Sequence, residues 1–173
     1  MKTCELIAII KTDLDNKHGS NFLCFCKKML LSNSFKLLLN YRIGRFFFQR
    51  DNLLTCKFLQ HRQIKRFSCQ ISYKAEIGAK LSLPHPIGIV IGEGVVIGDN
   101  VKIWQNVTLG SHGKKDEKLN YPVIEDGVKV FAGSMIIGGV NVKKNSIVGG
   151  LSLVLSDVEI NSKVAGIPAK VIK

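Results

Sequence analysis

From residue 71 onward, aliphatic residues recur every six positions along the chain. The three series are Ile71, Ile77 and Leu83; then Ile91, Ile97, Ile103 and Leu109; then Ile124, Val130, Ile136, Val142, Val148, Val154 and Ile160. A period of six fits neither the repeat of about 3.6 residues in an α-helix nor the alternation of a simple strand. If three six-residue faces make one turn, all these side chains point to one internal axis. The sequence therefore predicts an all-β solenoid, a parallel β-helix, over residues 70–173.

Two interruptions break this rhythm, and insertions in a solenoid map to loops on its binding face. The first is the segment 84–88, PHPIG, and the second is the polar excursion 111–122, SHGKKDEKLNYP. Each holds one of the two histidines of the repeat region, His85 and His112. His85 lies between two prolines that stiffen its loop, and imidazole is the side chain that best suits a general base near neutral pH. We therefore expect the chemistry at these two interruptions.

Residues 1–69 differ from the repeats in both charge and pattern. The segment holds 13 of the 25 Lys and Arg residues and 4 of the 13 Asp and Glu residues. It thus accounts for +9 of the formal net charge of +12. Residues 22–50 mix bulky apolar and basic residues without strand alternation, which predicts one or two helices with an apolar face within a helical segment 1–69.

Composition also argues against several classes of protein. No stretch approaches the ~18 apolar residues of a membrane span, and the N-terminus lacks the features of a signal peptide, so we expect a cytoplasmic protein. Five cysteines at irregular spacings, with no CxxC pair, indicate reduced thiols and no metal site. The basic charge comes without a recognition helix, zinc motif or interleaved aromatic residues, so we expect no nucleic-acid partner.

Three stretches resemble the hexapeptide-repeat acyltransferases, most closely the branch shared by serine acetyltransferases and polysaccharide O-acetyltransferases. They are HPIGIVIGE at 85–93, IWQNVTLG at 103–110 and AGIPAK at 165–170. The resemblance covers about residues 70–173. It implies a left-handed β-helix that assembles as a homotrimer and binds acetyl-CoA, as co-substrate, in a groove between neighbouring subunits.

The resemblance also implies roles for particular residues. His85 matches the family's general base. Contacts to CoA are expected at Ser111, Ala132, Gly133, Gly150 and Lys170, largely through backbone amides at the small residues. A small side chain lets the pantetheine arm approach the backbone closely. Residues expected on the acceptor side are Gln70, Glu93, His112, Asn120 and Tyr121.

The chain departs from the serine-specific pattern at three places. The aspartate that precedes the histidine in serine enzymes is here Pro84, and the carboxylate fifteen residues before the histidine is Gln70. The Arg-His pair at the end of the excursion is Asn120-Tyr121. A zwitterion such as serine is best held by charge-assisted hydrogen bonds, so these changes favour a neutral sugar hydroxyl.

We therefore expect an O-acetyltransferase that acts on a sugar hydroxyl of a surface polysaccharide or its precursor. Serine O-acetyltransferase of cysteine biosynthesis is the alternative, and a catalytically silent binding protein is a third hypothesis. Two uses of the basic segment 1–69 stay open. It packs on the trimer, or it makes peripheral contact with an anionic membrane through Arg42, Arg45 and Arg50.

Overall fold

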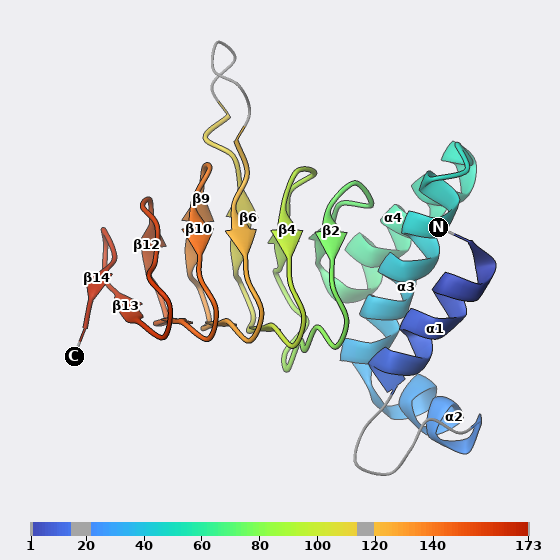
Figure 1. The fold of residues 1–173 in the computed structure, drawn as a ribbon. Coiled ribbons are helices and arrows are strands. Elements are labelled where there is room, and N and C mark those ends of the chain that lie inside the picture. The colour runs from blue at the N-terminus through green and yellow to red at the C-terminus, as the bar shows by residue number, and fades with distance from the viewer. Residues whose placement is uncertain (1, 15–21, 114–119, 173) are drawn as a thin grey trace.

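The computed structural model describes residues 2–14, 22–113 and 120–172 of the chain. Within them, four helices lie at one end of a column of short strands (Figure 1). The helices are α1 (Thr3–Leu14), α2 (Phe22–Leu31), α3 (Asn33–Phe48) and α4 (Leu53–Phe67). The predicted helices in the range 22–50 correspond to α2 and α3, and α1 and α4 lie in the rest of segment 1–69, which was expected to be helical without separate helices being assigned. None of the described helices is long and apolar enough to cross a bilayer.

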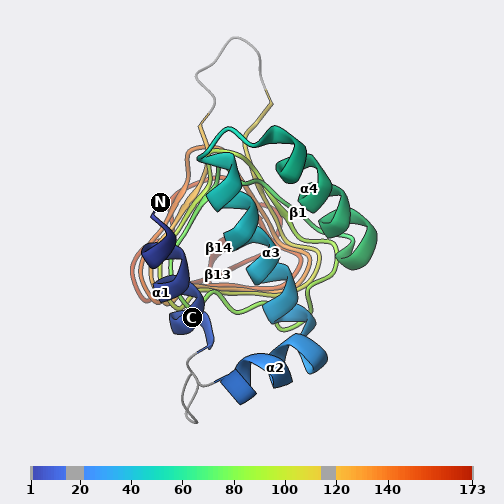
Figure 2. The ribbon, with the colours of Figure 1, turned by 90° about the vertical axis from the view of Figure 1, so that its right-hand side faces the viewer.

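The strands form three parallel sheets that enclose a triangular column (Figure 2). Sheet A contains β1 (Gln70–Ile71), β3 (Val90–Ile91), β6 (Thr108–Gly110), β9 (Met135–Ile137) and β12 (Leu153–Val154). Sheet B contains β2 (Glu76–Ile77), β4 (Val96–Ile97), β7 (Val123–Ile124) and β10 (Asn141–Val142). Sheet C contains β5 (Lys102–Ile103), β8 (Lys129–Val130), β11 (Ile147–Val148), β13 (Lys163–Ala165) and β14 (Lys170–Val171). Successive strands of the chain fall on successive faces, so the predicted coil is confirmed.

The six-residue period creates the core because each face contributes one inward side chain per turn. Ile91 pairs with Leu109, and Leu109 pairs with Ile136 in the next coil. All three are buried, and so are most of the residues four positions after a repeat residue, such as Val95, Val128 and Val140. Those second-layer residues include Ser134, whose hydroxyl lies 2.8 Å from the carbonyl oxygen of Phe131 and 2.7 Å from that of Gly149. The buried hydroxyl is therefore satisfied.

The last inward positions of the coil lie two residues earlier than the sequence pattern predicts. Ile160, the last member of the third series, is 54% exposed. Val158 takes an inward position by bridging to Val142, and Val164 pairs with Val148. The turn at 155–157 is two residues shorter than the six-residue period requires, because the inward position after Val154 is Val158, and this change of phase leaves Ile160 outside.

The column is closed at its C-terminal end by a change of strand direction. β14 runs antiparallel to β13, with Ala165 opposite Lys170. The segment between them covers β12, because the N–H of Leu153 donates to the carbonyl oxygen of Gly166 (3.0 Å) and the N–H of Ala169 donates to that of Leu153 (2.8 Å). The last coil is thus covered by the chain itself.

The helices are joined to the first coil through a buried polar network. The side-chain oxygen of Gln63 accepts the N–H of Ile71 (2.9 Å), and its amide nitrogen donates to the hydroxyl of Tyr73 (3.2 Å). That hydroxyl donates in turn to Asn40 on α3 (3.0 Å). Burial raises the pKa of Tyr73 above its ordinary value, which keeps the phenol neutral. The network links α3, α4 and sheet A.

A buried ion pair makes the second connection. The Arg42 guanidinium lies 2.9 Å from the carboxylate of Asp13 on α1 and donates to the carbonyl oxygens of Ile77 and Gly78. Both charged side chains are nearly inaccessible, at 3% and 1% exposure. Arg45 donates to the carbonyl oxygens of Tyr73 and Lys74. Of the two uses left open for segment 1–69, a membrane contact through Arg42 and Arg45 is contradicted, because both side chains bind the backbone of the first coil.

Candidate active site

The predicted site residues fall on two edges of the triangular column. The C/A edge, where the chain passes from sheet C to sheet A, comprises residues 84–88, 104–106, 131–133, 149–151 and 165–168. The A/B edge, between sheets A and B, comprises residues 92–94, 111–113, 120–122, 138–139 and 155–157. Sheet A separates the two edges within one chain.

The C/A edge stacks one short turn from each of five coils. The N–H of Asn106 donates to Ile87, that of Gly133 donates to Gln105, and that of Leu151 donates to Ala132, at 2.9 to 3.0 Å. His85, Ala132, Gly133 and Gly150 therefore lie along one line. Gly133 has a φ of +73°, and an added Cβ would collide with the side chain of Leu151. The left-handed backbone favours glycine there but does not require it, because the equivalent positions of the neighbouring coils are Asn106 (φ 57°) and Leu151 (φ 53°).

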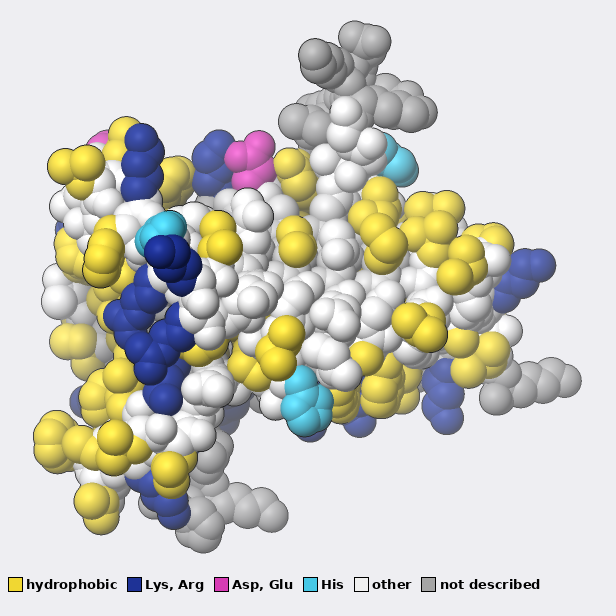
Figure 3. Space-filling view, turned by 180° about the vertical axis from the view of Figure 1, so that it is seen from behind, with side chains coloured by type: hydrophobic (Ala, Val, Ile, Leu, Met, Phe, Trp, Pro, Cys, Tyr) yellow, Lys and Arg dark blue, Asp and Glu magenta, His cyan; other side chains and the backbone are white. Residues whose placement is uncertain are grey.

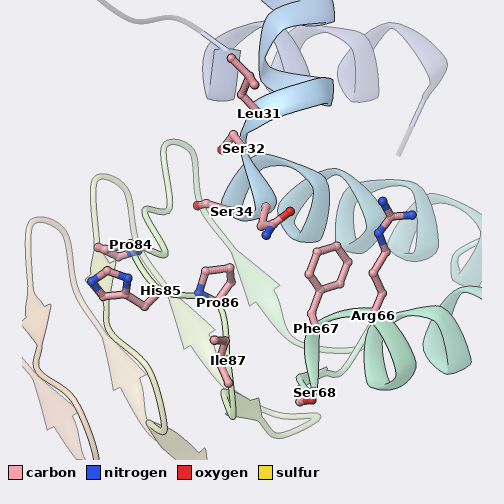
Figure 4. Close-up of a pocket in the computed structure, with 11 residues that line it drawn as sticks. Leu31, Ser32, Ser34, Arg66, Phe67, Ser68, Pro84, His85, Pro86 and Ile87 are labelled. Atoms are coloured by element: carbon pink, nitrogen blue, oxygen red, sulfur yellow. The ribbon is translucent and has the colours of Figure 1, made fainter.

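His85 borders a pocket of about 620 Å³ between the first coil and the helices (Figure 4). The lining residues are Leu31, Ser32, Asn33, Ser34, Arg66, Phe67, Ser68, Pro84, His85, Pro86 and Ile87. The start of α3 and the end of α4 form the walls opposite the loop 84–87 (Figure 4). The imidazole is exposed, and no hydrogen bond joins it to a described side chain.

Gln70, expected to orient the imidazole, lies on β1 with its side chain exposed. Its N–H donates to the carbonyl oxygen of Ile89 (2.9 Å). Among the described residues no hydrogen bond joins Gln70 to His85, so the orienting role stays a prediction.

The A/B edge holds the acceptor-side residues of the excursion. Tyr121 lies against Gly92 and Gly94, and a Cβ on either glycine would meet its ring. His112 packs in the same way on Gly138, and Asn120 on Gly139. The glycines of this edge thus make room for the two ends of the excursion, whose residues 114–119 lie outside the described residues.

Two further predicted residues have defined partners. Glu93 on the A/B edge lies 2.6 Å from the ammonium of Lys74, and this hydrogen bond raises the pKa of Lys74. Ser111 accepts the N–H of Gly113 (3.3 Å).

Lys170 is exposed on β14, at the end of the C/A edge that is farthest from His85. No cluster of His, Cys, Asp or Glu side chains suited to a metal ion occurs among the residues that the structure describes.

Three residues at the pocket were missed by the sequence analysis. Arg66 and Ser68 lie at the end of α4, and Ser34 lies in the first turn of α3. The signal that could have found Arg66 is its place four residues before Gln70, which is already an expected site residue. No separate helix was assigned before the first coil, so nothing connected Arg66 to the loop of His85.

The outer surface of the later coils is apolar. Figure 3 shows hydrophobic side chains gathered there, away from the helical end. Exposed examples are Phe131 (37%), Met135 (44%) and Leu151 (74%). Phe131 also stacks on Trp104, with ring centroids 4.3 Å apart. An apolar area of this kind is typical of a surface that contacts another protein.

The chain is similar in sequence and in fold to serine acetyltransferases. The chain is 37% identical over 144 residues to the serine acetyltransferase of Buchnera aphidicola from Acyrthosiphon pisum, covering 83% of this chain and 53% of that protein. It matches the soybean serine acetyltransferase complexed with serine at a TM-score of 0.85 and 30% identity, over 96% of this chain and 69% of that one. A serine acetyltransferase in complex with CoA matches at a TM-score of 0.83 and 27% identity, over 98% of this chain and 71% of that one.

The fold and the edge that carries His85 define a hexapeptide-repeat acyltransferase with a left-handed β-helix. Within that class, the chain belongs to the serine acetyltransferase family. It spans about half the length of the curated relatives it matches. No protein-family model matches the chain.

These relatives overturn the expectation of a sugar hydroxyl as the acceptor, since the similar proteins are named serine acetyltransferases. The expectation was drawn from the uncharged residues at Pro84, Gln70 and the end of the excursion. Those three places are the positions at which the serine enzymes carry charged residues. The pocket instead has a cation from α4, Arg66, which that reasoning did not include.

Proposed function

We propose that this protein transfers the acetyl group of acetyl-CoA to the hydroxyl of L-serine, with His85 as the general base. The observation that carries the proposal is the position of His85. It borders the pocket at one end of the C/A edge, whose later turns carry the small residues Ala132, Gly133 and Gly150. The relatives with serine and CoA in their structures support the same two substrates here.

The proposed reaction moves one proton and one acetyl group. The imidazole of His85 takes the proton of the serine hydroxyl as its oxygen attacks the thioester carbonyl carbon. The tetrahedral intermediate then breaks its bond to sulfur, and the proton on the imidazole neutralises the leaving CoA thiolate. General-base help of this kind typically contributes ~10²–10⁴ in rate.

The length of the C/A edge suits the other substrate. Adjacent coils are ~4.8 Å apart, so three steps from the coil of His85 to the coil of Gly150 cover ~14 Å. An extended pantetheine arm is about four residue-lengths of chain, or ~14 Å at ~3.5 Å each. With the thioester at His85, the CoA diphosphate would lie near Gly150, and the remainder would extend toward Lys170.

We also propose that the site is completed in a homotrimer. His85 and the excursion residues Asn120 and Tyr121 lie on opposite edges of sheet A in one chain. Chains packed side by side would bring the C/A edge of one next to the A/B edge of another. The exposed Phe131 and Met135 give such contacts an apolar surface. A cytoplasmic location stays a prediction from the sequence.

The decisive experiment follows thiol release from acetyl-CoA with L-serine as the acceptor. His85→Ala should lower kcat at least ~100-fold, which is the loss expected when a general base is removed. His61→Ala is the matched control, because His61 is exposed on α4 and does not line the pocket. Its activity should equal that of the natural sequence.

Two results would contradict the proposal. One is a natural protein that releases no thiol with L-serine. The other is a His85→Ala variant whose turnover matches that of His61→Ala. Sedimentation analysis tests the assembly separately, and a protein that is monomeric in the presence of acetyl-CoA would exclude the homotrimer.

A further inference from the structure

Resting on the proposed function, we infer that Arg66 binds the carboxylate of the acceptor and thereby selects acceptors that carry an acid group. Arg66 is in the last turn of α4 and lines the pocket that His85 borders. Of the described residues that line this pocket, it alone has a formal charge when histidine is neutral. The carboxylate is the anionic group of L-serine, so the two charges match.

The backbone around Arg66 holds it at the pocket wall. The next residue, Phe67, is buried (6% exposed) and anchors the end of α4. Ser68 then ends the helix with a left-handed φ of 50° and donates its N–H to the carbonyl oxygen of Ile64 (3.0 Å). The chain turns directly into β1 after this cap. The position of Arg66 is therefore fixed relative to the first coil and its loop.

The N–H donors of the Arg66 guanidinium are not used by the described residues. No hydrogen bond or ion pair joins the Arg66 side chain to a described residue, whereas Arg42 and Arg45 are both bound to backbone carbonyls. Arginine presents five N–H donors in a planar fork that matches a carboxylate. The Arg66 side chain is exposed and lines the pocket, so its guanidinium is available to an acceptor bound there.

The rest of the pocket suits the remainder of such a ligand. α3 begins at this pocket, and its N-cap Ser32 accepts the N–H of Phe35 (3.1 Å). The positive end of the α3 dipole therefore faces the same space and adds to the attraction for an anion. His85 lines the other side of the pocket from Arg66 (Figure 4), and in the proposed reaction its imidazole takes the proton of the acceptor hydroxyl.

Basic residues on α4 extend this positive potential beyond the pocket. Figure 3 shows Lys and Arg side chains as a dark-blue stripe over the helical end. On α4 the exposed basic residues are Lys57, Arg62, Lys65 and Arg66. A row of one sign of charge raises the local concentration of oppositely charged substrates. Arg66 is the member of the row that reaches the pocket lining.

The test compares two variants of Arg66 with two acceptors. Arg66→Gln should raise the KM for L-serine about 10-fold or more, the loss expected for a charge-assisted hydrogen bond, with a smaller change in kcat. Arg66→Lys keeps the charge and should recover part of that loss. L-serinamide has the same hydroxyl without a carboxylate, so its KM should be the same for Arg66→Gln as for the natural protein.

Arg62→Gln is the matched control, because Arg62 is exposed one turn earlier on the same helix and does not line the pocket. It should leave the KM for L-serine within about twofold of the natural value, as expected for a surface substitution. Thermal unfolding of each variant checks that the fold is retained.

The outcomes separate this inference from the proposed function. If the natural protein does not acetylate L-serine, the proposed function itself fails. If it does, and Arg66→Gln leaves the KM for L-serine unchanged, only the role of Arg66 is overturned. A rise in the KM for acetyl-CoA with no change for L-serine would also overturn it, because Arg66 would then bind a CoA phosphate.

Discussion

The β-helix and the helical end are stabilised in different ways. In the β-helix every coil repeats the same inward aliphatic positions, so no single contact is unique and each coil supports its neighbours. The helical end depends on a few connections that occur once, such as the Arg42 ion pair and the Gln63 hydrogen bonds. In the β-helix the free energy of unfolding is spread over many similar contacts. In the helical end it depends on a few contacts, so we expect a substitution at one of those to have the larger effect.

The largest expected effect on stability comes from the connection that occurs once. Arg42→Ala leaves Asp13 buried without its cation, which typically costs about 3–5 kcal/mol. Helix content by circular dichroism should fall at a lower temperature than the fluorescence of Trp104, the single tryptophan, which lies in the β-helix. Arg62→Ala, at an exposed position, should change neither transition. Coincident loss of both signals would show that the two regions unfold as one unit.

A second prediction addresses the repeated region. Ile103 is fully buried on β5, and Ile103→Ala should lower the free energy of unfolding by about 2–5 kcal/mol because it leaves a cavity. Here the Trp104 fluorescence transition should move to lower denaturant concentration. Lys129→Ala, on the outer surface of the paired strand β8, is the control. Equal midpoints for Ile103→Ala and Lys129→Ala would contradict the assignment of the core.

The smallest effect is expected at a corner of the column. The backbone N–H of Asp99 and the ammonium of Lys144 lower the pKa of Asp126. A carboxyl group with a lowered folded-state pKa adds stability above its ordinary pKa of about 4, and this is lost as the pH falls through that range. Asp126→Asn should therefore reduce the melting temperature slightly at pH ~7 and less at pH ~3. If the difference in melting temperature between Asp126→Asn and the natural protein became larger as the pH falls, the prediction would be contradicted.

Much of the β-helix could be predicted from the sequence because its period is strict. The repeat positions from Ile71 to Val154 are inside, and His85 lies in the interruption that borders the pocket. The error at Ile160 arose because one shortened turn changes the phase, and a fixed period does not detect a shortened turn.

The helical end could not be predicted to the same depth. Its contacts join residues far apart in the sequence, such as Asp13 to Arg42 and Arg42 to Gly78. No local pattern indicates that Arg42 is buried, and the place of Arg66 four residues before Gln70 points to the pocket only once the end of α4 is known. The acceptor was predicted wrongly from positions within the repeat region and its excursion, and Arg66 lies outside both.

The way in which the column ends also has a consequence for solubility. A stack of parallel strands presents a row of unsatisfied amides at each end, and such a row can pair with the next molecule and grow into a fibre. Gln63 receives the amide of Ile71 at one end, and the reversed strand β14 covers β13 at the other. Both ends are thus protected against head-to-tail growth, so the stack keeps a defined length.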